Sequence, residues 1–399
     1  MANTRSANPI LIAGAGIGGL SAAIALARKD IPSKILERSK AHSTDGAGIQ
    51  LGPNASRILD EWGVLERLLP RSVICEGVTI GDGITGEILA TVPFGETAQQ
   101  RYGAPFLLVH RSDLHNALVE CARDHSSIEI TKDCEVLAYQ QFPDEITLTT
   151  SRGEKQGRGL IVADGLWSML RPQIDAGATL EFTGKTAWRT LIDPEELPEL
   201  NHVPWTGLWL SQSAHLVHYP VCGGKKINVV AVIDERWGGR SQGWNQEADP
   251  QELLPHFEQW NDRLENIVTS GSKWRKWSLF YQPPLRAWTQ GSVTMIGDAA
   301  HPVLPFLAQG GGLAIEDAAV LVKILNAHDG DPWHAFRDFE KTRIERTART
   351  SYESRKMGKI YHMGGVMRLA RNFVLRRQSP NSLLQRLDWL YQYRVENGK

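Results

Sequence analysis

The alternation of apolar and polar positions predicts a β-α-β unit at the start of the chain. Residues 9–13 form a short apolar run typical of a buried parallel strand, and residues 20–28 have the period of a helix. Residues 31–33 interrupt that period before a second short strand over 34–37. The turn between the first strand and the helix, 14–19, is rich in glycine, so its backbone can approach other groups closely.

The rest of the chain predicts a second sheet and long helices. Apolar and polar residues alternate over 75–108, where turn glycines indicate antiparallel strands. Further strands are expected at 186–192, 215–220, 227–233 and 292–296. Segments with a helical period are 54–68, 111–121, 312–325 and 333–360. The pattern is that of an α/β fold into which a second, largely antiparallel sheet is inserted.

Composition favours a small ligand over a macromolecular partner. The 399 residues include 44 Lys and Arg against 45 Asp and Glu, a balance without general attraction to nucleic acid or anionic membrane. The four cysteines show no Cys-x-x-Cys pair and no metal-ligand spacing, which predicts a reducing, cytoplasmic location and no bound metal. No apolar run reaches the roughly 18 residues of a membrane span, so we expect no membrane partner. We also expect a monomer or homodimer.

The two ends of the chain bear on targeting and on binding. Residues 1–8 lack the apolar core of a signal peptide. The segment 368–394 is basic and largely helical in pattern. We interpret its charge as a solvated face, with membrane or partner binding as the alternative.

The glycine-rich turn has the spacing of a dinucleotide-binding motif. Gly14 permits the tight turn from strand to helix, Gly16 lets the backbone approach a pyrophosphate, and Gly19 lets the helix pack closely on the strand. Glu37 can accept hydrogen bonds from ribose hydroxyls, and Arg38 beside it can cover an adenosine. An incidental glycine-rich turn is the alternative, but the apolar strand before it and Glu37 after it favour a dinucleotide.

Two further motifs follow along the chain. The first is Asp164-Gly165, and the second is Gly297-Asp298-Ala299-Ala300-His301-Pro302, with three glycines at 310–312. In this order the motifs resemble those of the aromatic-ring flavoprotein monooxygenases of the para-hydroxybenzoate hydroxylase family. The loop 46–54 resembles most the branch with salicylate hydroxylase and 3-hydroxybenzoate 6-hydroxylase. Taken alone, each motif could be an ordinary turn or helix cap.

The resemblance implies FAD, held tightly but non-covalently. At the end of its strand, Gly297-Asp298 would place the Asp298 carboxylate against the ribityl chain. The helix that begins at Gly310, Gly311 and Gly312 would direct its N–H groups and positive dipole end at the flavin ring.

Other residues are assigned to the cofactors by the same resemblance. Asp164 and Gly165 would face the pyrophosphate regions of both FAD and the nicotinamide cofactor. Arg111 would reach the FAD phosphate, with a surface arginine as the alternative, and Gly48 would lie beside the flavin. The sequence has no second glycine motif of this kind. The resemblance implies that NADH or NADPH visits only transiently.

Strand alternation places candidate substrate-binding side chains on one face of the second sheet. His215 and Tyr219 would share a face with Val217, and His218 would point to the other face. By the resemblance, His215 would serve as base for a phenol and Tyr219 would hold a carboxylate. A hydrogen-bonded structural histidine and a core tyrosine are the alternative.

Two other residues would border the ring. Gln50 could bond a carboxylate or hydroxyl, or could be a surface amide of its glycine-flanked loop. Pro302 stiffens a segment that in the family borders the place where oxygen meets the flavin.

The fold class expected from the resemblance is α/β, with an FAD-binding Rossmann-like domain and an interleaved substrate-binding sheet domain. The expected division is 1–74, 100–180 and 282–330 for FAD, 75–99 and 181–281 for the substrate, and 331–399 as a C-terminal helical segment.

The resulting hypothesis is an FAD-dependent monooxygenase that uses NAD(P)H and O₂ to hydroxylate a small aromatic acid, through a flavin C(4a)-hydroperoxide. Salicylate and 3-hydroxybenzoate are the leading candidates. A flavin dehydrogenase or reductase on the same fold, and a non-enzymatic FAD-binding redox sensor, are the alternatives. The sequence leaves open the ring substrate, loss of its carboxylate, the preferred nicotinamide and the oligomeric state.

Overall fold

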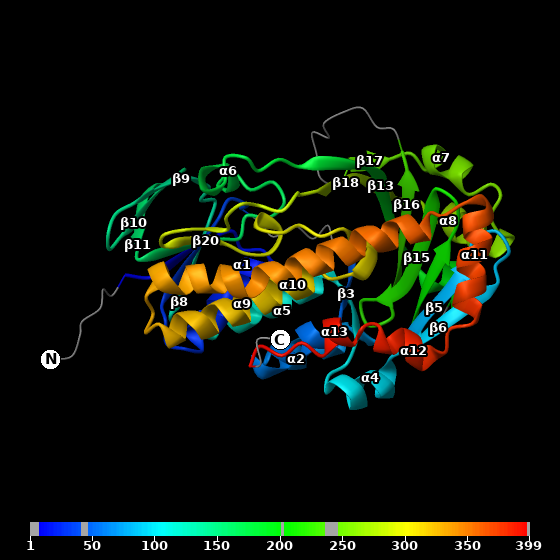
Figure 1. Cartoon of the computed structure of the whole chain (residues 1–399), viewed down its shortest axis with the longest axis horizontal. Helices are drawn as coiled ribbons and strands as arrows, with labels where there is room; N and C mark the ends of the chain where they lie inside the picture. The colour runs from blue at the N-terminus through cyan, green and yellow to red at the C-terminus, as the bar shows by residue number, and fades with distance from the viewer. Residues whose placement is uncertain (1–7, 41–46, 201–202, 236–245, 397–399) are drawn as a thin grey trace.

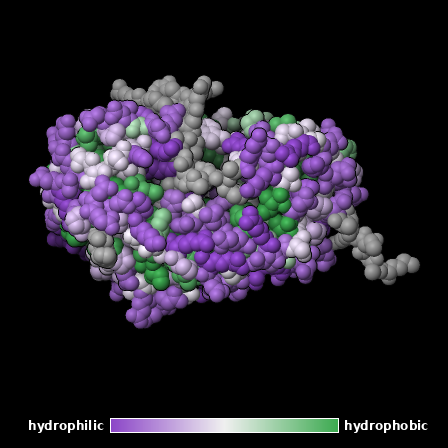
Figure 2. Space-filling model, turned by 180° about the vertical axis from the view of Figure 1, so that it is seen from behind, coloured by the Kyte–Doolittle hydropathy of each residue, from purple (hydrophilic) through white to green (hydrophobic). Residues whose placement is uncertain are grey.

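The computed structural model describes residues 8–40, 47–200, 203–235 and 246–396. Two sheets lie toward opposite ends of an elongated molecule, and a long helix runs between them (Figure 1). The face seen in Figure 2 is largely hydrophilic, with small separate hydrophobic patches. Most of the terminal segment 1–8 and the first residue of the loop 46–54 lie outside the described residues.

The first sheet has six strands in the order β19-β20-β12-β1-β2-β8, and every neighbouring pair except β19–β20 is parallel. Its strands are β1 (Ile10–Ala13), β2 (Ser33–Glu37), β8 (Ile128–Lys132), β12 (Gly159–Val162), β19 (Thr289–Gln290) and β20 (Val293–Met295). Every residue of β1, β12 and β20 is buried, because parallel sheets are covered on both faces.

Three helices accompany this sheet. They are α1 (Ile17–Ala27), α5 (Arg111–Arg123) and α9 (Gly310–Ala327), and α1 packs against both of the others. The small residues of α1 allow this close packing, since its alanines and Gly19 are buried.

The second sheet has eight strands in the order β17-β18-β13-β16-β15-β14-β5-β6. Its strands are β5 (Gly77–Asp82), β6 (Ile88–Pro93), β13 (Glu181–Ile192), β14 (Trp205–Leu210), β15 (Ala214–Val221), β16 (Lys226–Asp234), β17 (Gln246–Ala248) and β18 (Trp274–Tyr281). All neighbours are antiparallel except β5 and β14. Helices α7 (Pro250–Leu253) and α8 (Asp262–Thr269) contribute to the core that covers one face, which includes Trp188, Leu216 and Leu264.

Two small sheets complete the strands. One joins β3 (Gly48–Leu51), β7 (Leu107–His110) and β4 (Val73–Ile74), and the other joins β9 (Val136–Gln141), β10 (Ile146–Thr150) and β11 (Gly153–Gly157). The first of them brings Gly48 to the second sheet, because the Gly48 N–H donates to Asn228 Oδ1 at 2.7 Å.

Two local expectations were wrong. The helical pattern 54–68 is divided into α2 (Pro53–Glu61) and α3 (Val64–Leu68), because Gly63 adopts a φ of +73° that ends the first helix. The range 75–108 holds the hairpin β5–β6 but also a helix, α4 (Gly95–Tyr102). A further short helix, α6 (Arg171–Ile174), follows β12.

The C-terminal helices are α10 (Pro332–Tyr361), α11 (Gly365–Arg376), α12 (Pro380–Gln385) and α13 (Asp388–Tyr391). Helix α10 packs on α9 and runs toward the second sheet (Figure 1). The interpretation of 368–394 as a solvated face was wrong in part. Arg368 donates to the fully buried Asp82 at 2.8 and 2.5 Å, and Arg371 is itself buried, so these charges attach α11 to β5.

Candidate functional site

Five parallel strands end at the same edge of the six-stranded sheet, which we call the carboxyl edge. The motif residues follow directly after β1, β12 and β20, and Glu37 is the last residue of β2. The Gly14 N–H donates to Leu36 O at 2.8 Å, and the Ala163 N–H donates to Ala13 O at 2.9 Å. Segments far apart in sequence therefore meet at the place where doubly wound sheets bind their ligands.

The glycine-rich turn has the geometry that its spacing predicts. Gly14 has a φ of +104°, and a Cβ there would lie 2.6 Å from Ala163 O. A Cβ on Gly19 would lie 1.9 Å from Gly14 O, so only glycine permits α1 to start this close to β1. Nothing lies within 4 Å of a Cβ built on Gly16, which leaves the backbone open to a phosphate.

Glu37 contacts the glycine-rich turn through its side chain. Its carboxylate accepts from the N–H groups of Ala15 and Ser39, each at 2.8 Å, and Arg38 beside it is exposed. His115 of α5 also contacts the turn, with Nε2 2.8 Å from Ala15 O. No spacing signal in the sequence connected His115 to the turn.

The Asp164 motif is joined to the Gly297 motif by one buried arginine. Arg171 donates to the carbonyl oxygens of Ala299 at 2.7 Å and Asp298 at 2.8 Å, and also to Gly165 O at 3.2 Å. Asp164 Oδ2 accepts from a backbone N–H, but its buried Oδ1 has no hydrogen-bond partner among the described residues. Burial raises the pKa of Asp164.

Asp298 lies at the carboxyl edge, three residues after the end of β20, at a place that we call the recess. Its side chain is exposed, yet the surrounding protein atoms desolvate it and raise its pKa, whereas His301, Arg111 and Arg171 lower the pKa. Because solvent reaches the side chain, we take the carboxylate to be ionised at neutral pH. Arg111 is exposed at the first turn of α5, and its positive charge lowers the pKa of Asp298.

The N-terminus of α9 opens onto this recess. A Cβ on Gly310 would lie 3.9 Å from Asp298 Oδ1, and a Cβ on Gly311 would lie 2.7 Å from the Ile49 side chain. The helix begins with three glycines and has neither a side-chain cap nor an acidic residue in its first turn. Its free N–H groups and dipole therefore favour a negative charge beside them.

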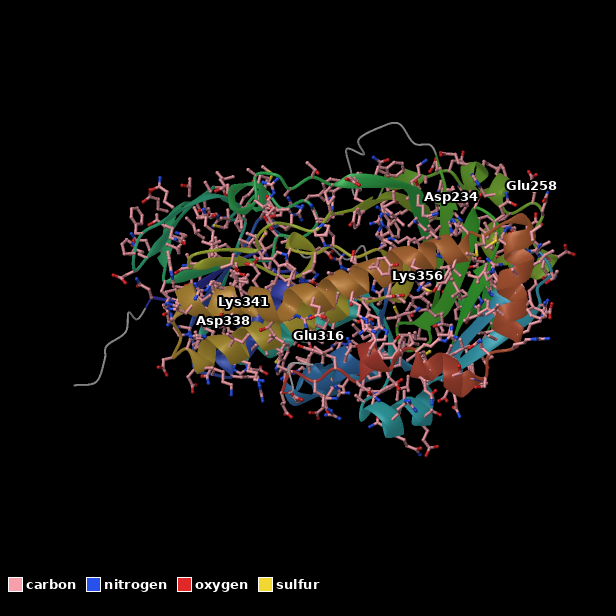
Figure 3. The ribbon with its side chains drawn as sticks, in the orientation of Figure 1. Asp234, Glu258, Glu316, Asp338, Lys341 and Lys356 are labelled. Carbon is pink, nitrogen blue, oxygen red and sulfur yellow. The ribbon has the colours of Figure 1, made fainter. Side chains whose placement is uncertain are left out.

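A buried ionic cluster supports that helix from behind. Glu316 and Asp317 are fully buried, and Arg343 of α10 donates to both at 2.8 Å. Arg346 adds two bonds to Glu316, at 2.6 and 2.7 Å. Figure 3 shows Glu316 in the region where α9 lies beside α10. Two adjacent acidic residues inside a largely apolar helix were the signal in the sequence for this cluster.

The cluster reaches the motif residues directly. Asp317 Oδ2 accepts from the Gly297 N–H at 2.9 Å and lies 2.5 Å from His301 Nε2. Asn54 of α2 donates to Glu316 Oε1 at 2.7 Å. The α9 carboxylates thus hold the Gly297 loop in place.

The opposite side of the site is a face of the second sheet, which we call the wall. Strand β15 alternates as predicted, with His215 and Tyr219 toward the carboxyl edge. A Cβ on Gly48 would lie 2.6 Å from the Tyr219 ring, and the His215 ring is 5.5 Å from that of Phe306. Both side chains are buried.

Comparison with known proteins agrees with this arrangement. A family model described as FAD binding domain matches residues 7–330. A 3-hydroxybenzoate 6-hydroxylase of Polaromonas naphthalenivorans (strain CJ2) is 34% identical over 391 residues, which cover 98% of this chain and 97% of the relative. The chain is an FAD-dependent aromatic monooxygenase of the para-hydroxybenzoate hydroxylase family.

Two further comparisons bear on the monooxygenase. A 3-amino-4-hydroxybenzoate 2-monooxygenase of Streptomyces platensis is 33% identical, with 96% of each chain covered. The structure of a salicylate hydroxylase in complex with substrate has a TM-score of 0.83 at 23% identity, with 98% of each chain covered, which shows the shared fold. The expected α/β fold with an FAD-binding unit is confirmed.

The carboxyl edge of the monooxygenase fits FAD. The open space beside Gly16 and Gly165, the unpartnered oxygen of Asp164 and the uncapped α9 terminus are the features that a diphosphate and a flavin ring require. The individual residue roles stay predictions.

The wall has two polar residues that the sequence reasoning missed. Asn228 lies opposite Tyr219 in the β15–β16 register, and its buried Nδ2 has no hydrogen-bond partner in the described chain. Arg189 is buried on the neighbouring strand, stacks on Trp277 at 5.4 Å, and lowers the pKa of Tyr219, which burial otherwise raises.

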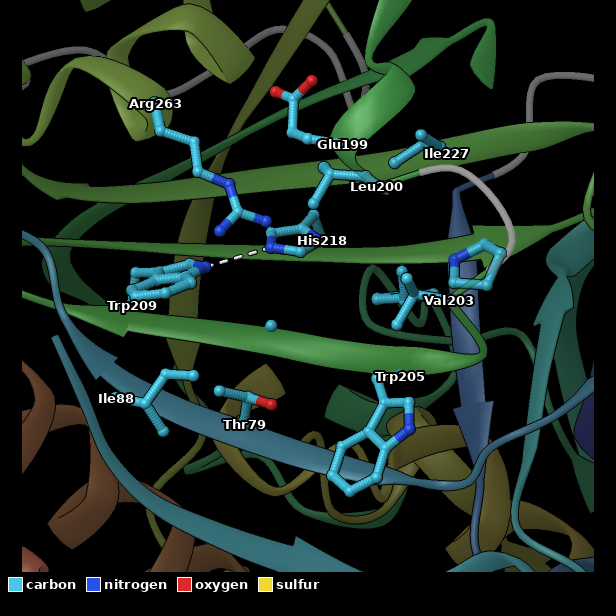
Figure 4. Close-up of a pocket in the computed structure, with 13 residues that line it drawn as sticks. Thr79, Ile88, Glu199, Leu200, Val203, Trp205, Trp209, His218, Ile227 and Arg263 are labelled. Carbon is cyan, nitrogen blue, oxygen red and sulfur yellow. Dashed lines mark hydrogen bonds between the residues drawn. The ribbon is translucent and has the colours of Figure 1, made fainter. Parts of the chain in front are cut away.

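His218 lies on the other face of β15, as predicted. Its Nε2 accepts from Trp209 Nε1 at 3.0 Å, and burial lowers its pKa to about 4 (Figure 4). His218 lines a cavity of about 120 Å³ together with Arg263 and Trp205. Tyr219 also contributes to this lining, but the Tyr219 ring contacts Gly48 and the His215 ring contacts Phe306, whereas His218 contacts Trp209.

Gln50 and Pro302 take different positions. Gln50 is half-buried on β3 and pairs with Leu108, close to the Gly48 contact with the wall. Pro302 lines a cavity of about 190 Å³ together with Trp288 and Arg355 of α10.

A group of possible metal ligands occurs beside β7, although the sequence predicted none. One atom each of His110, Asp113 and Cys222 lies within 4.8 Å of the others. Burial raises the pKa of Cys222, which disfavours the thiolate that a metal ion would require. Among the described residues, no helix is long and apolar enough to cross a membrane.

Proposed function

We propose that the monooxygenase uses NAD(P)H and O₂ to hydroxylate a small hydroxybenzoate-like acid, with salicylate and 3-hydroxybenzoate as the leading candidates. The observation that carries the proposal is the wall, where a buried histidine and a buried tyrosine share one sheet face opposite the carboxyl edge. Four residues along a strand span roughly 13 Å, and Val217 lies on the same face between them, so an aromatic ring lying over Val217 could contact both side chains.

His215 is the proposed base for the phenol. Burial lowers its pKa well below the usual value, so the ring is neutral at neutral pH and has one unprotonated nitrogen that can accept a hydrogen bond from a phenol. Its Nδ1 is engaged by His362 at 2.7 Å, whereas Nε2 has no hydrogen-bond partner in the described chain. A phenol hydroxyl beside Nε2 would transfer its proton there, which activates the ring toward an electrophilic oxygen.

The carboxylate would bind at the other end of the wall. Tyr219 and Asn228 can each donate one hydrogen bond to it, and the positive charge of Arg189 favours an anion nearby. Gln50 would complete the donors from the side of β3. Burial keeps Tyr219 protonated, because it raises the pKa of its phenol.

FAD, when bound, supplies the redox chemistry with NAD(P)H and O₂. The chain itself binds the cofactor along the carboxyl edge, orients the ring between His215 and Tyr219, and excludes water from the space between them. The N–H groups at 310–312 would stabilise negative charge on the bound cofactor.

A panel of carboxylated phenols tests the proposal. Each acid is incubated with the FAD-loaded enzyme and NADH or NADPH, while nicotinamide oxidation and product mass are followed. One added oxygen indicates simple hydroxylation, and oxygen gain with loss of CO₂ indicates the decarboxylating reaction. Nicotinamide oxidation without oxygen in the product would favour a reductase, and no oxidation with any ligand would favour a redox sensor.

A further inference from the structure

A chain of hydrogen bonds leads from His215 to the protein surface. His215 Nδ1 lies 2.7 Å from His362 Nε2, and His362 Nδ1 lies 2.7 Å from Asp234 Oδ1. His215 is buried, His362 is nearly so, and the Asp234 side chain is 40% exposed. Figure 3 shows Asp234 near the far end of α10 from Glu316.

Few charged groups surround this chain of hydrogen bonds among the described residues. Lys185 of β13 lies 2.9 Å from His362 Nδ1 and pairs with Asp234 across the strands. Arg371 of α11 faces His362 from the helix side and lowers its pKa, as Lys185 does, whereas Asp234 raises it. Burial is the largest influence on His362 and makes its pKa lower than usual, so the ring is neutral near pH 7.

When the His215 and His362 rings are both neutral, the hydrogen bonds between them and their neighbours can point in only two directions. If His362 Nδ1–H donates to Asp234, then His362 Nε2 accepts from His215 Nδ1–H, and His215 Nε2 is left as an acceptor. If Lys185 donates to His362 Nδ1, every bond reverses and His215 Nε2 carries the proton. The two arrangements differ by the transfer of one proton along the chain.

We propose that His362 and Asp234 form a proton relay that carries the substrate's phenolic proton from His215 to solvent. This inference rests on the proposed function of His215. The phenol O–H bond breaks as His215 Nε2–H forms, the His215 Nδ1 proton passes to His362 Nε2, and the His362 Nδ1 proton passes to Asp234. Asp234 releases it to water, and the reverse transfers reset the rings after product leaves. His362 and Asp234 are thus positioning residues.

Two variants test the relay without touching the ring site. Asp234→Asn removes the terminal acceptor, and His362→Gln removes the middle ring. Asp193→Asn is the matched control, because Asp193 pairs with Lys226 at the opposite end of the same two strands, at 2.6 Å, with no histidine between them. All three proteins are compared as FAD-loaded holoenzymes.

The activity readout is the pH profile of kcat with the acid that wild type turns over fastest. We expect kcat of Asp234→Asn at pH 7 to fall at least tenfold with little change in KM, and to recover as pH rises. A ring-fluorinated analogue with a more acidic phenol should restore most of the rate. Asp193→Asn should match wild type. A loss of rate that neither pH nor the fluorinated acid restores would overturn the relay.

The second readout does not depend on turnover. Spectra of ¹⁵N-histidine-labelled holoenzyme report which nitrogen of His215 carries the proton, with the His362→Gln variant used for assignment. We expect the Nδ1–H form in wild type and a shift toward the Nε2–H form in Asp234→Asn. An unchanged His215 tautomer in Asp234→Asn contradicts the relay, whereas failure of every phenolic acid as substrate contradicts the proposed function instead.

Discussion

The carboxyl edge and the wall face each other across the site, but they are built from different materials. The carboxyl edge is built from backbone. It has glycines where two segments pass too closely for a Cβ, free N–H groups at the first turns of two helices, and loops whose carbonyl oxygens are hydrogen-bonded by Arg171. The wall uses side chains that adjacent strands place opposite each other, such as Tyr219 and Asn228. A site built from backbone can bind the cofactor that all members of a family share, because it depends little on side chains. A site built from side chains can change its substrate, because those side chains can vary without changing the fold.

The largest expected effect comes from the support behind the carboxyl edge. Arg343→Met leaves Glu316 and Asp317 buried with an uncompensated charge, so the free energy of unfolding should fall by about 3–5 kcal/mol. Urea denaturation of the holoenzyme measures this loss. Arg337→Met, at an exposed position of the same helix, should change it by less than about 0.5 kcal/mol. Equal stability of the two variants would contradict the supporting role of the cluster.

His215→Ala separates the two sides of the site. It should keep FAD and its visible spectrum but lower hydroxylation by roughly a hundredfold or more, the scale of a positioned acid–base group. His218→Ala on the opposite face should have a much smaller effect. If both variants hydroxylate like wild type, the histidine of the wall is structural.

Asp298→Ala should produce the opposite result. Loss of a charged acceptor from the recess should weaken FAD binding by about 1–3 kcal/mol, which raises Kd roughly ten- to a hundredfold. Flavin fluorescence during titration of the apoprotein measures the change, with the exposed Asp60→Ala as control. If Asp298→Ala binds FAD as tightly as wild type, Asp298 does not contact the cofactor.

The smallest expected effect lies at the carboxylate end of the wall. Tyr219→Phe should raise KM for the acid roughly tenfold with little change in kcat, because one hydrogen bond to a charged group is lost. A phenol without a carboxylate serves as the control substrate, since Tyr219 would not contact its missing group. An equal change in KM for both compounds would indicate altered packing of the wall.

The sequence alone predicted most of the carboxyl edge, because its chemistry depends on short local motifs. The positions of Gly14 and Gly19 follow from turn geometry within a few residues, and each meets the close contact that such turns create, whereas Gly297 was assigned through the family resemblance. Strand alternation likewise separated His215 from His218, since the two-residue period of a strand is a local property.

Only the tertiary structure decided what surrounds those residues. His362 follows a 30-residue helix and Asp234 ends β16, so no spacing connects either of them to His215. The same holds for Asn228, whose position opposite Tyr219 depends on strand register. Local motifs are set by backbone conformation, whereas contacts between distant segments depend on how buried charge and apolar surface are packed together.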